Sequence, residues 1–305
     1  MRWCLRLKTL CLSRGSGEVR PALRYHGAKF RLAPWVMSFF PPHTCYCEPF
    51  GGAAGVLLQK PRAYAEVYND LDGDVVNFFR VLQDPALRAQ LVDRVALTPY
   101  ARAEFEKAWQ PSRGRVERAR RLAIRAHMSF GSAGATKSIT GFRIDTKRQY
   151  GTAQALWEQY PLAIAEAGQR LSGVLIENRP AIKVMTAHDA LDTLHFVDPP
   201  YVLSTRDSRA GTSRSAYRHE MSDNDHVQLI AALNQLIGMV ALSGYESELY
   251  AAQLKGWQRH TTEARITGGR GSAVRTEVIW LNPACVAGLR PHQATQSVLE
   301  LEELP

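Results

Sequence analysis

Residues 194–201 read L-H-F-V-D-P-P-Y, a largely apolar strand candidate that stops at an acid and two prolines. The two prolines fix the φ angle and remove two backbone donors, so the strand must end there in a stiff turn. A prescribed tetrapeptide such as D-P-P-Y occurs by chance in a chain of this length on the order of once in a thousand cases. Because open α/β sheets bind ligands at the carboxyl ends of parallel strands, this turn predicts a ligand site.

Other short apolar runs on both sides of this turn also end in Gly, Pro, Asn or Asp, and helical patterns follow several of them. The predicted strands are 43–47, 63–68, 184–187, 194–197, 239–242 and 277–281. The predicted helices begin at about 56 and cover 74–82, 222–236 and 245–254. This alternation predicts an α/β fold built on a parallel sheet.

The first predicted strand runs into E-P-F-G-G-A-A-G at 48–55. Gly51, Gly52 and Gly55 permit a tight turn and a close approach of a nucleoside to the backbone. Asp70 follows the next predicted strand about twenty residues later, where an acid commonly binds the two hydroxyls of a ribose. The two features together indicate a nucleoside site, although an aspartate in a turn would look the same.

The D-P-P-Y turn offers hydrogen-bond acceptors and an aromatic ring. An ionised Asp198 and the carbonyl of Pro199 can accept both protons of an NH2 group, and Pro200 stiffens the corner. Tyr201 supplies a flat face on which a base can stack. The turn therefore predicts recognition of an exocyclic amine.

The formal charge of +9 is concentrated in one internal segment and the N-terminal tail. Residues 101–150 hold twelve Lys/Arg against four acids, and residues 1–24 hold six against one. A localised basic block suits phosphate contacts, although arginine-rich helices are as often solvated faces. The candidate DNA contacts are Arg113, Arg115, Arg118, Arg121, Arg125, Lys137, Arg143, Arg206, Arg209 and Arg214.

The remaining composition excludes several classes of protein. No apolar run reaches the roughly eighteen residues of a membrane span, and arginines interrupt any signal peptide, which predicts a cytoplasmic protein. The five cysteines lack paired spacing, so neither a disulfide framework nor a metal site is predicted.

The motifs and their order resemble the Dam-type DNA adenine-N6 methyltransferase family in its alpha arrangement, over about residues 22–290. A Y-x-G-x-K element comes first, then the E-P-F-x-G loop, the acid after Asn69, an acid facing the cofactor adenine in A-H-D-A, and D-P-P-Y. By this resemblance the cofactor residues are Tyr25, Gly27, Lys29, Glu48, Pro49, Phe50, Gly51, Gly52, Asp70 and Asp189, and the catalytic residues are Asp198, Pro199, Pro200 and Tyr201.

The resemblance implies a Rossmann-like methyltransferase sheet, S-adenosylmethionine as cofactor, and methyl transfer to an adenine flipped out of double-stranded DNA. It implies a catalytic domain over 22–90 and 181–290, with an inserted, mainly helical target-recognition domain over 91–180. Residues 1–21 and 291–305 are then a basic extension and a tail. A bacterial or phage origin is expected, while the oligomeric state and a separate cognate restriction endonuclease stay open.

Four other functions fit the same residues less well. A cytosine-N4 methyltransferase uses similar acceptors, but its turn usually begins with Ser and that of glutamine-modifying relatives with Asn, so Asp198 favours adenine. A cytosine-C5 enzyme needs a Pro-Cys pair, which the sequence lacks. A nicotinamide oxidoreductase would need a different glycine loop, and Glu48 would repel a pyrophosphate. A DNA-binding module without catalysis is disfavoured by the intact Asp70 and Asp198.

Overall fold

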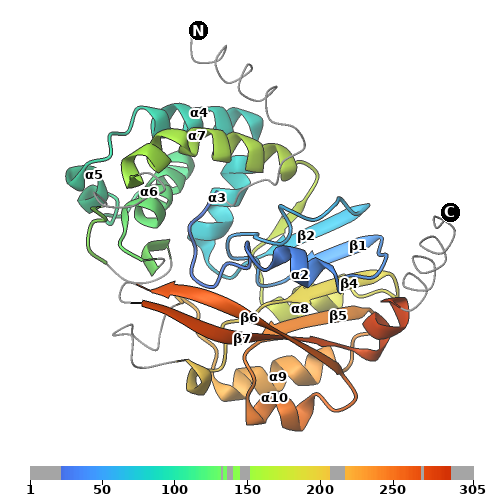
Figure 1. Cartoon of the computed structure of the whole chain (residues 1–305). Helices are drawn as coiled ribbons and strands as arrows, with labels where there is room; N and C mark the ends of the chain where they lie inside the picture. The colour runs from blue at the N-terminus through green and yellow to red at the C-terminus, as the bar shows by residue number, and fades with distance from the viewer. Residues whose placement is uncertain are drawn as a thin grey trace, which may run out of the picture.

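The computed structural model describes residues 22–131, 133–135, 140–144, 152–206, 217–268 and 271–289. One seven-stranded sheet with the order β3-β2-β1-β4-β5-β7-β6 runs through the molecule (Figure 1). The strands are β1 Cys45–Glu48, β2 Ala65–Asn69, β3 Leu175–Glu177, β4 Thr193–Val197, β5 Met239–Gly244, β6 Gln258–Gly268 and β7 Gly271–Leu281. The expected Rossmann-like α/β fold is confirmed.

The first five strands of the sheet are parallel, whereas β7 pairs antiparallel with both β5 and β6. The chain moves outward from β1 to β2 and β3, then returns to place β4 on the other side of β1. This reversal of strand order opens a crevice at the carboxyl ends of β1 and β4. The long β6–β7 hairpin completes the edge beside β5, so the sheet is mixed rather than wholly parallel.

Helices cover both faces of the sheet, as the alternation of side chains along each strand requires. Leu194 and Phe196 of β4 belong to the larger core, while Val197 belongs to a second core on the opposite face. The helices of the first face are α2 Ala33–Met37, α3 Gly73–Gln83, α4 Pro85–Ala96, α5 Arg102–Lys107, α6 Arg115–Met128 and α7 Ala153–Arg170. Those of the second are α8 Ala181–Ala187, α9 Asp223–Leu233 and α10 Glu248–Gln253.

Helices α4 to α7 gather beyond one end of the sheet (Figure 1). Helices α4, α6 and α7 pack on α3, and α5 packs on α6. Their buried side chains, such as Leu122 and Ile164, are continuous with the core that covers the sheet. Helix α4 runs across residue 90 without a break. The target-recognition domain over 91–180 therefore stays a prediction. Two short 3-10 turns lie at Ala133–Ala135 and Leu203–Thr205.

Two predicted elements were wrong. Residues 184–187 are not a strand but the end of α8, in which Val184 and Met185 are buried on one side of a helix. The expected helix at 56 is a run of turns: Gly52 and Ala54 before it take positive φ angles, and Pro61 just after it cannot continue a helix. A capping box is present at Ser222, and Gly268 pairs with Gly271 at the end of the β6–β7 hairpin.

Within the described residues, no helix is long and apolar enough to cross a membrane.

Candidate active site

A cavity of about 330 Å³ lies at the carboxyl ends of β1, β2, β3 and β4. Its size falls within the range of small-molecule sites. All the predicted cofactor residues except Asp189 line it, namely Tyr25, Gly27, Lys29, Glu48, Pro49, Phe50, Gly51, Gly52 and Asp70. Asp198 and Pro200 line the same cavity, so the fold brings the glycine loop and the D-P-P-Y turn together.

The loop after β1 is shaped by contacts that only glycine allows. The Gly51 N–H donates to the carbonyl of Asn69 at 2.7 Å, and a Cβ on Gly51 would fall 2.1 Å from the ring of Tyr68. Gly52 has φ of +48°, and its carbonyl accepts from the Tyr68 hydroxyl at 2.7 Å. The loop is therefore held flat against the end of β2, which leaves its outer side to the cavity.

Asp70 ends β2 and is fixed by two backbone donors. Its Oδ2 accepts from the Gly52 N–H at 2.9 Å and its Oδ1 from the Asp72 N–H at 2.8 Å. Burial is the main cause that raises the pKa of Asp70, to about 6. Since each carboxylate oxygen can accept more than one hydrogen bond, Asp70 retains acceptor capacity toward the cavity.

Glu48 lies at the end of β1 and is 3% exposed. Its Oε2 accepts from the Tyr46 hydroxyl at 2.8 Å and from the Leu57 N–H at 3.0 Å. Burial raises the pKa of Glu48 to about 8, so the acid is neutral at pH 7. A neutral Glu48 holds the loop in place without adding a charge to the cavity.

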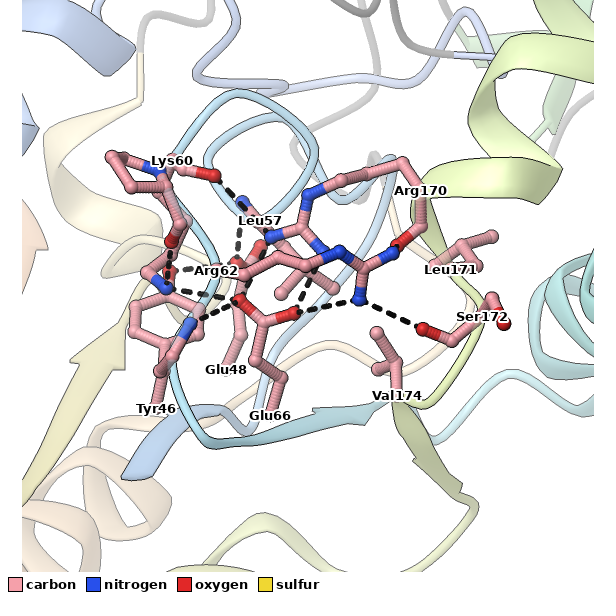
Figure 2. Close-up of polar contacts among 12 residues, drawn as sticks. Tyr46, Glu48, Leu57, Lys60, Arg62, Glu66, Arg170, Leu171, Ser172 and Val174 are labelled. Atoms are coloured by element: carbon pink, nitrogen blue, oxygen red, sulfur yellow. Dashed lines mark hydrogen bonds and ion pairs between the residues drawn. The ribbon is translucent and has the colours of Figure 1, made fainter. Parts of the chain in front are cut away.

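A buried ion network supports this loop from behind (Figure 2). The Lys60 ammonium lies 4.6 Å from the ring centre of Tyr46 and 3.0 Å from Glu66 Oε1. Arg170, at the end of α7, donates to both oxygens of Glu66, at 2.6 and 2.8 Å. Arg62 caps the same helix end by donating to the carbonyl of Arg170 at 2.7 Å. The network joins α7 to β2 and to the tyrosine that holds Glu48.

Asp198 and Lys29 form an ion pair at the end of β4. The Lys29 Nζ lies 2.9 Å from Asp198 Oδ1 and donates to the Gly27 carbonyl at 3.1 Å. Lys29 is only 7% exposed. The resemblance implied that this lysine would bind the cofactor, and its acidic partner in this structure is Asp198 of the D-P-P-Y turn.

Tyr201 is held at both its hydroxyl and its ring. The hydroxyl lies 2.8 Å from Glu277 Oε2 and 3.0 Å from Ser243 Oγ. The Lys29 ammonium sits 4.6 Å from the ring centre, and the ring of Tyr245 meets it edge-on at 4.5 Å. Pro199 is buried beside it. The face predicted to stack on a base is thus shared with Lys29.

The sequence analysis did not predict several residues of the cavity wall. Residues 179–182 follow β3, a three-residue strand whose apolar run V-L-I before E-N-R-P was its only signal. Tyr217 covers Gly27, whose Cβ position is 2.3 Å from the Tyr217 hydroxyl. Arg218 reaches Asp72 at 3.0 Å and Asp74 at 3.3 Å. These contacts close the cavity between the ends of β2 and β4.

The structure does not bring Asp189 to the cavity. Asp189 precedes β4, at the opposite edge of the sheet from the glycine loop, and its carboxylate accepts from the N–H groups of Ile237 and Gly238, both at 2.9 Å. The sequence placed this acid at the cofactor because 184–187 was taken for a strand. As that segment is a helix, Asp189 stands at the start of a strand rather than at the end of one.

Some of the predicted DNA contacts are exposed, others lie in contacts within the protein, and the rest fall outside the described residues. Arg113 and Arg115 are exposed near the start of α6. Arg118 and Arg125 pair with Asp74 at 2.7 and 3.5 Å, and Arg121 pairs with Glu117 at 2.8 Å.

Two more of these residues lie in protein contacts. Arg143 is 8% exposed, and Arg206 pairs with Glu220 at 2.8 Å. Lys137, Arg209 and Arg214 lie outside the described residues, as do 1–21 and 291–305. Much of the basic charge in α6 therefore serves intramolecular ion pairs.

The chain matches a known protein family. The family model of the D12 class N6 adenine-specific DNA methyltransferases matches residues 25–266, which is more than half of the chain. No curated protein matches the sequence at a significant level. The matched range begins at Tyr25 and includes the glycine loop, Asp70 and the D-P-P-Y turn.

Proposed function

The chain belongs to the D12 class N6 adenine-specific DNA methyltransferase family, and from that premise we propose which of its residues hold the methyl donor and the adenine. The family consists of enzymes that methylate adenine N6 in duplex DNA, and it implies S-adenosylmethionine as the donor. The match thereby favours adenine over the cytosine-N4 alternative and catalysis over a binding module.

The cavity suits a cationic nucleoside. Asp70 is a fixed acceptor at the end of β2, where ribose hydroxyls can donate to it, and the loop of Gly51 and Gly52 leaves room for a nucleoside beside the backbone. The carboxylate of Asp198 adds a second acceptor to the same cavity, near the ring of Phe50. When bound, S-adenosylmethionine supplies a methyl group on a sulfonium, which needs no further activation.

Asp198 and Pro199 would hold the adenine. An aromatic amine is a poor nucleophile because its lone pair is delocalised into the ring. The Asp198 carboxylate and the Pro199 carbonyl accept the two amine protons, and this localises the lone pair as positive charge develops on nitrogen. The ion pair with Lys29 fixes the direction of the acceptor before the base arrives.

The target adenine has to leave the duplex to reach this corner, at a cost of a few kcal/mol. Tyr201 then supplies a stacking surface. Arg113 and Arg115 are the exposed members of the predicted DNA contacts and would bind phosphates, whereas Arg118 and Arg125 would set the position of α6 through Asp74. Acting on duplex DNA, the enzyme would work in the cytoplasm of a bacterial or phage-infected cell.

One observation carries the assignment of the residues. The acceptor of the D-P-P-Y turn and the glycine loop open into the same cavity at neighbouring strand ends, β4 and β1. Donor and adenine can therefore meet there without movement of the sheet.

The test removes the carboxylate of Asp198 and keeps the rest of the cavity intact. The recognition site is first identified by methylome sequencing of a host that expresses the gene. Asp198→Ala should abolish transfer of a tritiated methyl group to duplex DNA while calorimetric binding of S-adenosylhomocysteine persists. Asp192→Ala, which removes an exposed acid just before the same strand, is the matched control and should stay active. Turnover by the Asp198 variant would reject the assignment.

A further inference from the structure

Glu277 is a buried acid close to the D-P-P-Y turn that belongs to none of the motifs above. It lies on β7, is 7% exposed, and its Oε2 is 2.8 Å from the Tyr201 hydroxyl. Burial raises the pKa of Glu277, and Lys29, Asp198 and Tyr245 lie close enough to influence it. A well-packed apolar side chain at this position would avoid the cost of burying a carboxyl group.

The hydrogen bonds of Tyr201 have one consistent assignment when Glu277 is ionised. The carboxylate can only accept, so the Tyr201 hydroxyl donates its single proton to Glu277. The tyrosine oxygen is then left to accept from the Ser243 hydroxyl at 3.0 Å. Both functions of the hydroxyl are used, and the far end of the ring is fixed to β5 and β7.

The D-P-P-Y turn fixes the backbone end of the Tyr201 side chain, while Lys29 and Tyr245 contact its ring. Lys29 lies over the ring and also pairs with Asp198, so the ring, the ammonium and the acceptor form one contact group. A rotation of Tyr201 would disturb that group. The hydroxyl contact with Glu277 opposes such a rotation from a strand that is 76 positions away in sequence.

We propose that Glu277 is a positioning residue, which holds Tyr201 through its hydroxyl in the orientation that accepts the flipped adenine. The inference rests on the proposed function, because it assumes that the base stacks on Tyr201. Glu277 touches neither the adenine nor the donor in this scheme. Its effect passes through one hydrogen bond, and that bond can be removed from either side.

A double-mutant cycle measures this effect. The variants are E277L, E277Q, Y201F and the doubles E277L/Y201F and E277Q/Y201F. The readouts are kcat/KM for methyl transfer and the fluorescence of 2-aminopurine placed at the target adenine, which reports base flipping. Because it removes a hydrogen bond to a charged group, E277L should lower kcat/KM by about 10- to 150-fold and reduce the fluorescence rise.

The conservative variants separate positioning from folding. E277Q keeps an oxygen that accepts from Tyr201 and should retain kcat/KM within about threefold. Y201F alone should reproduce most of the E277L loss, and E277L added to Y201F should cost less than about twofold more. E263L removes an exposed acid from the same hairpin and is the matched control.

Full activity and normal fluorescence of Y201F would overturn the inference, and so would an E277L loss of equal size in the wild-type and Y201F backgrounds. If E277L does not fold, the kcat/KM values of E277Q and Y201F still test the inference, because E277Q should stay active and Y201F should not. Failure of the proposed function is a different result, because it appears as turnover by D198A whatever the cycle gives.

Discussion

Binding of the methyl donor should weaken in mild acid because of Asp70. Burial raises the pKa of this carboxyl to about 6 in the free enzyme. In the proposed complex the ribose hydroxyls donate to Asp70, which favours its ionised form. Donor binding therefore competes with a proton, and the sign is fixed: the apparent affinity is highest above pH 6 and falls as the pH drops below it.

The magnitude follows from the pKa. If only the ionised form binds, the apparent Kd is multiplied by one plus the ratio of protonated to ionised Asp70. With a pKa of about 6 this factor is about 1.1 at pH 7 and about 11 at pH 5. The affinity should fall about tenfold over those two pH units, which is about 1.4 kcal/mol. The pKa of Glu48, about 8, keeps that neighbour protonated throughout.

Isothermal titration calorimetry with S-adenosylhomocysteine between pH 5 and pH 7.5 measures this dependence, and buffers of different ionisation enthalpy count the protons released. Asp70→Asn removes the titrating group and should bind weakly with no pH dependence over the same range. A wild-type Kd that stays constant from pH 5 to pH 7 would refute the proposed contact between Asp70 and the ribose.

Three further outcomes follow from the contacts around the site. The pKa of Glu48 is about 8 in the folded state and 4.5 in the unfolded state. Between these two pH values the folded state keeps a proton that the unfolded state has lost, so the free energy of unfolding decreases as the pH rises from 4.5 to about 8. E48Q should remove this decline in urea unfolding between pH 5.5 and 8.5, and parallel wild-type and E48Q profiles would contradict it. R170A breaks a buried ion pair and should cost about 2 kcal/mol of unfolding free energy, against at most about 0.5 for the half-exposed R94A; equal losses would reject the network. R113A and R115A should each reduce the salt slope of DNA binding in anisotropy titrations by about 0.9, and an unchanged slope in the double variant would exclude both from phosphate contact.

The sequence predicted those parts of the site in which the functional side chains and the end of the strand lie in one short stretch. The D-P-P-Y turn and the E-P-F-G-G loop carry both their polar groups and the residues that stop the strand. Asp70 was placed because the spacing from the glycines corresponds to one turn, one strand and its end. Local sequence therefore sufficed for the ends of β1, β2 and β4.

The errors occur where one segment fits two kinds of element. Residues 184–187 contain a β-branched valine and a methionine, which suit a buried strand as well as a helix, and α8 forms because one side of it packs under the sheet. Asp189 was misplaced as a consequence. The length of β6 was not predicted, because residues 258–264 are mostly polar and are exposed or half-buried, which gives no apolar pattern.

The arginines of α6 show why charge in sequence does not locate a DNA contact. Arg118 and Arg125 converge on Asp74, at the start of α3, and Arg218 reaches the same carboxylate from the segment that closes the cavity. A sequence gives the number of basic residues but not their partners, which come from elements far apart in the chain. Because three arginines share Asp74, this carboxylate links α6 to α3 and to the segment that closes the cavity. It acts beside the apolar packing of α6 on α3 and the contact of Arg218 with Asp72. We therefore expect phosphate binding by any of these arginines to compete with its ion pair to Asp74.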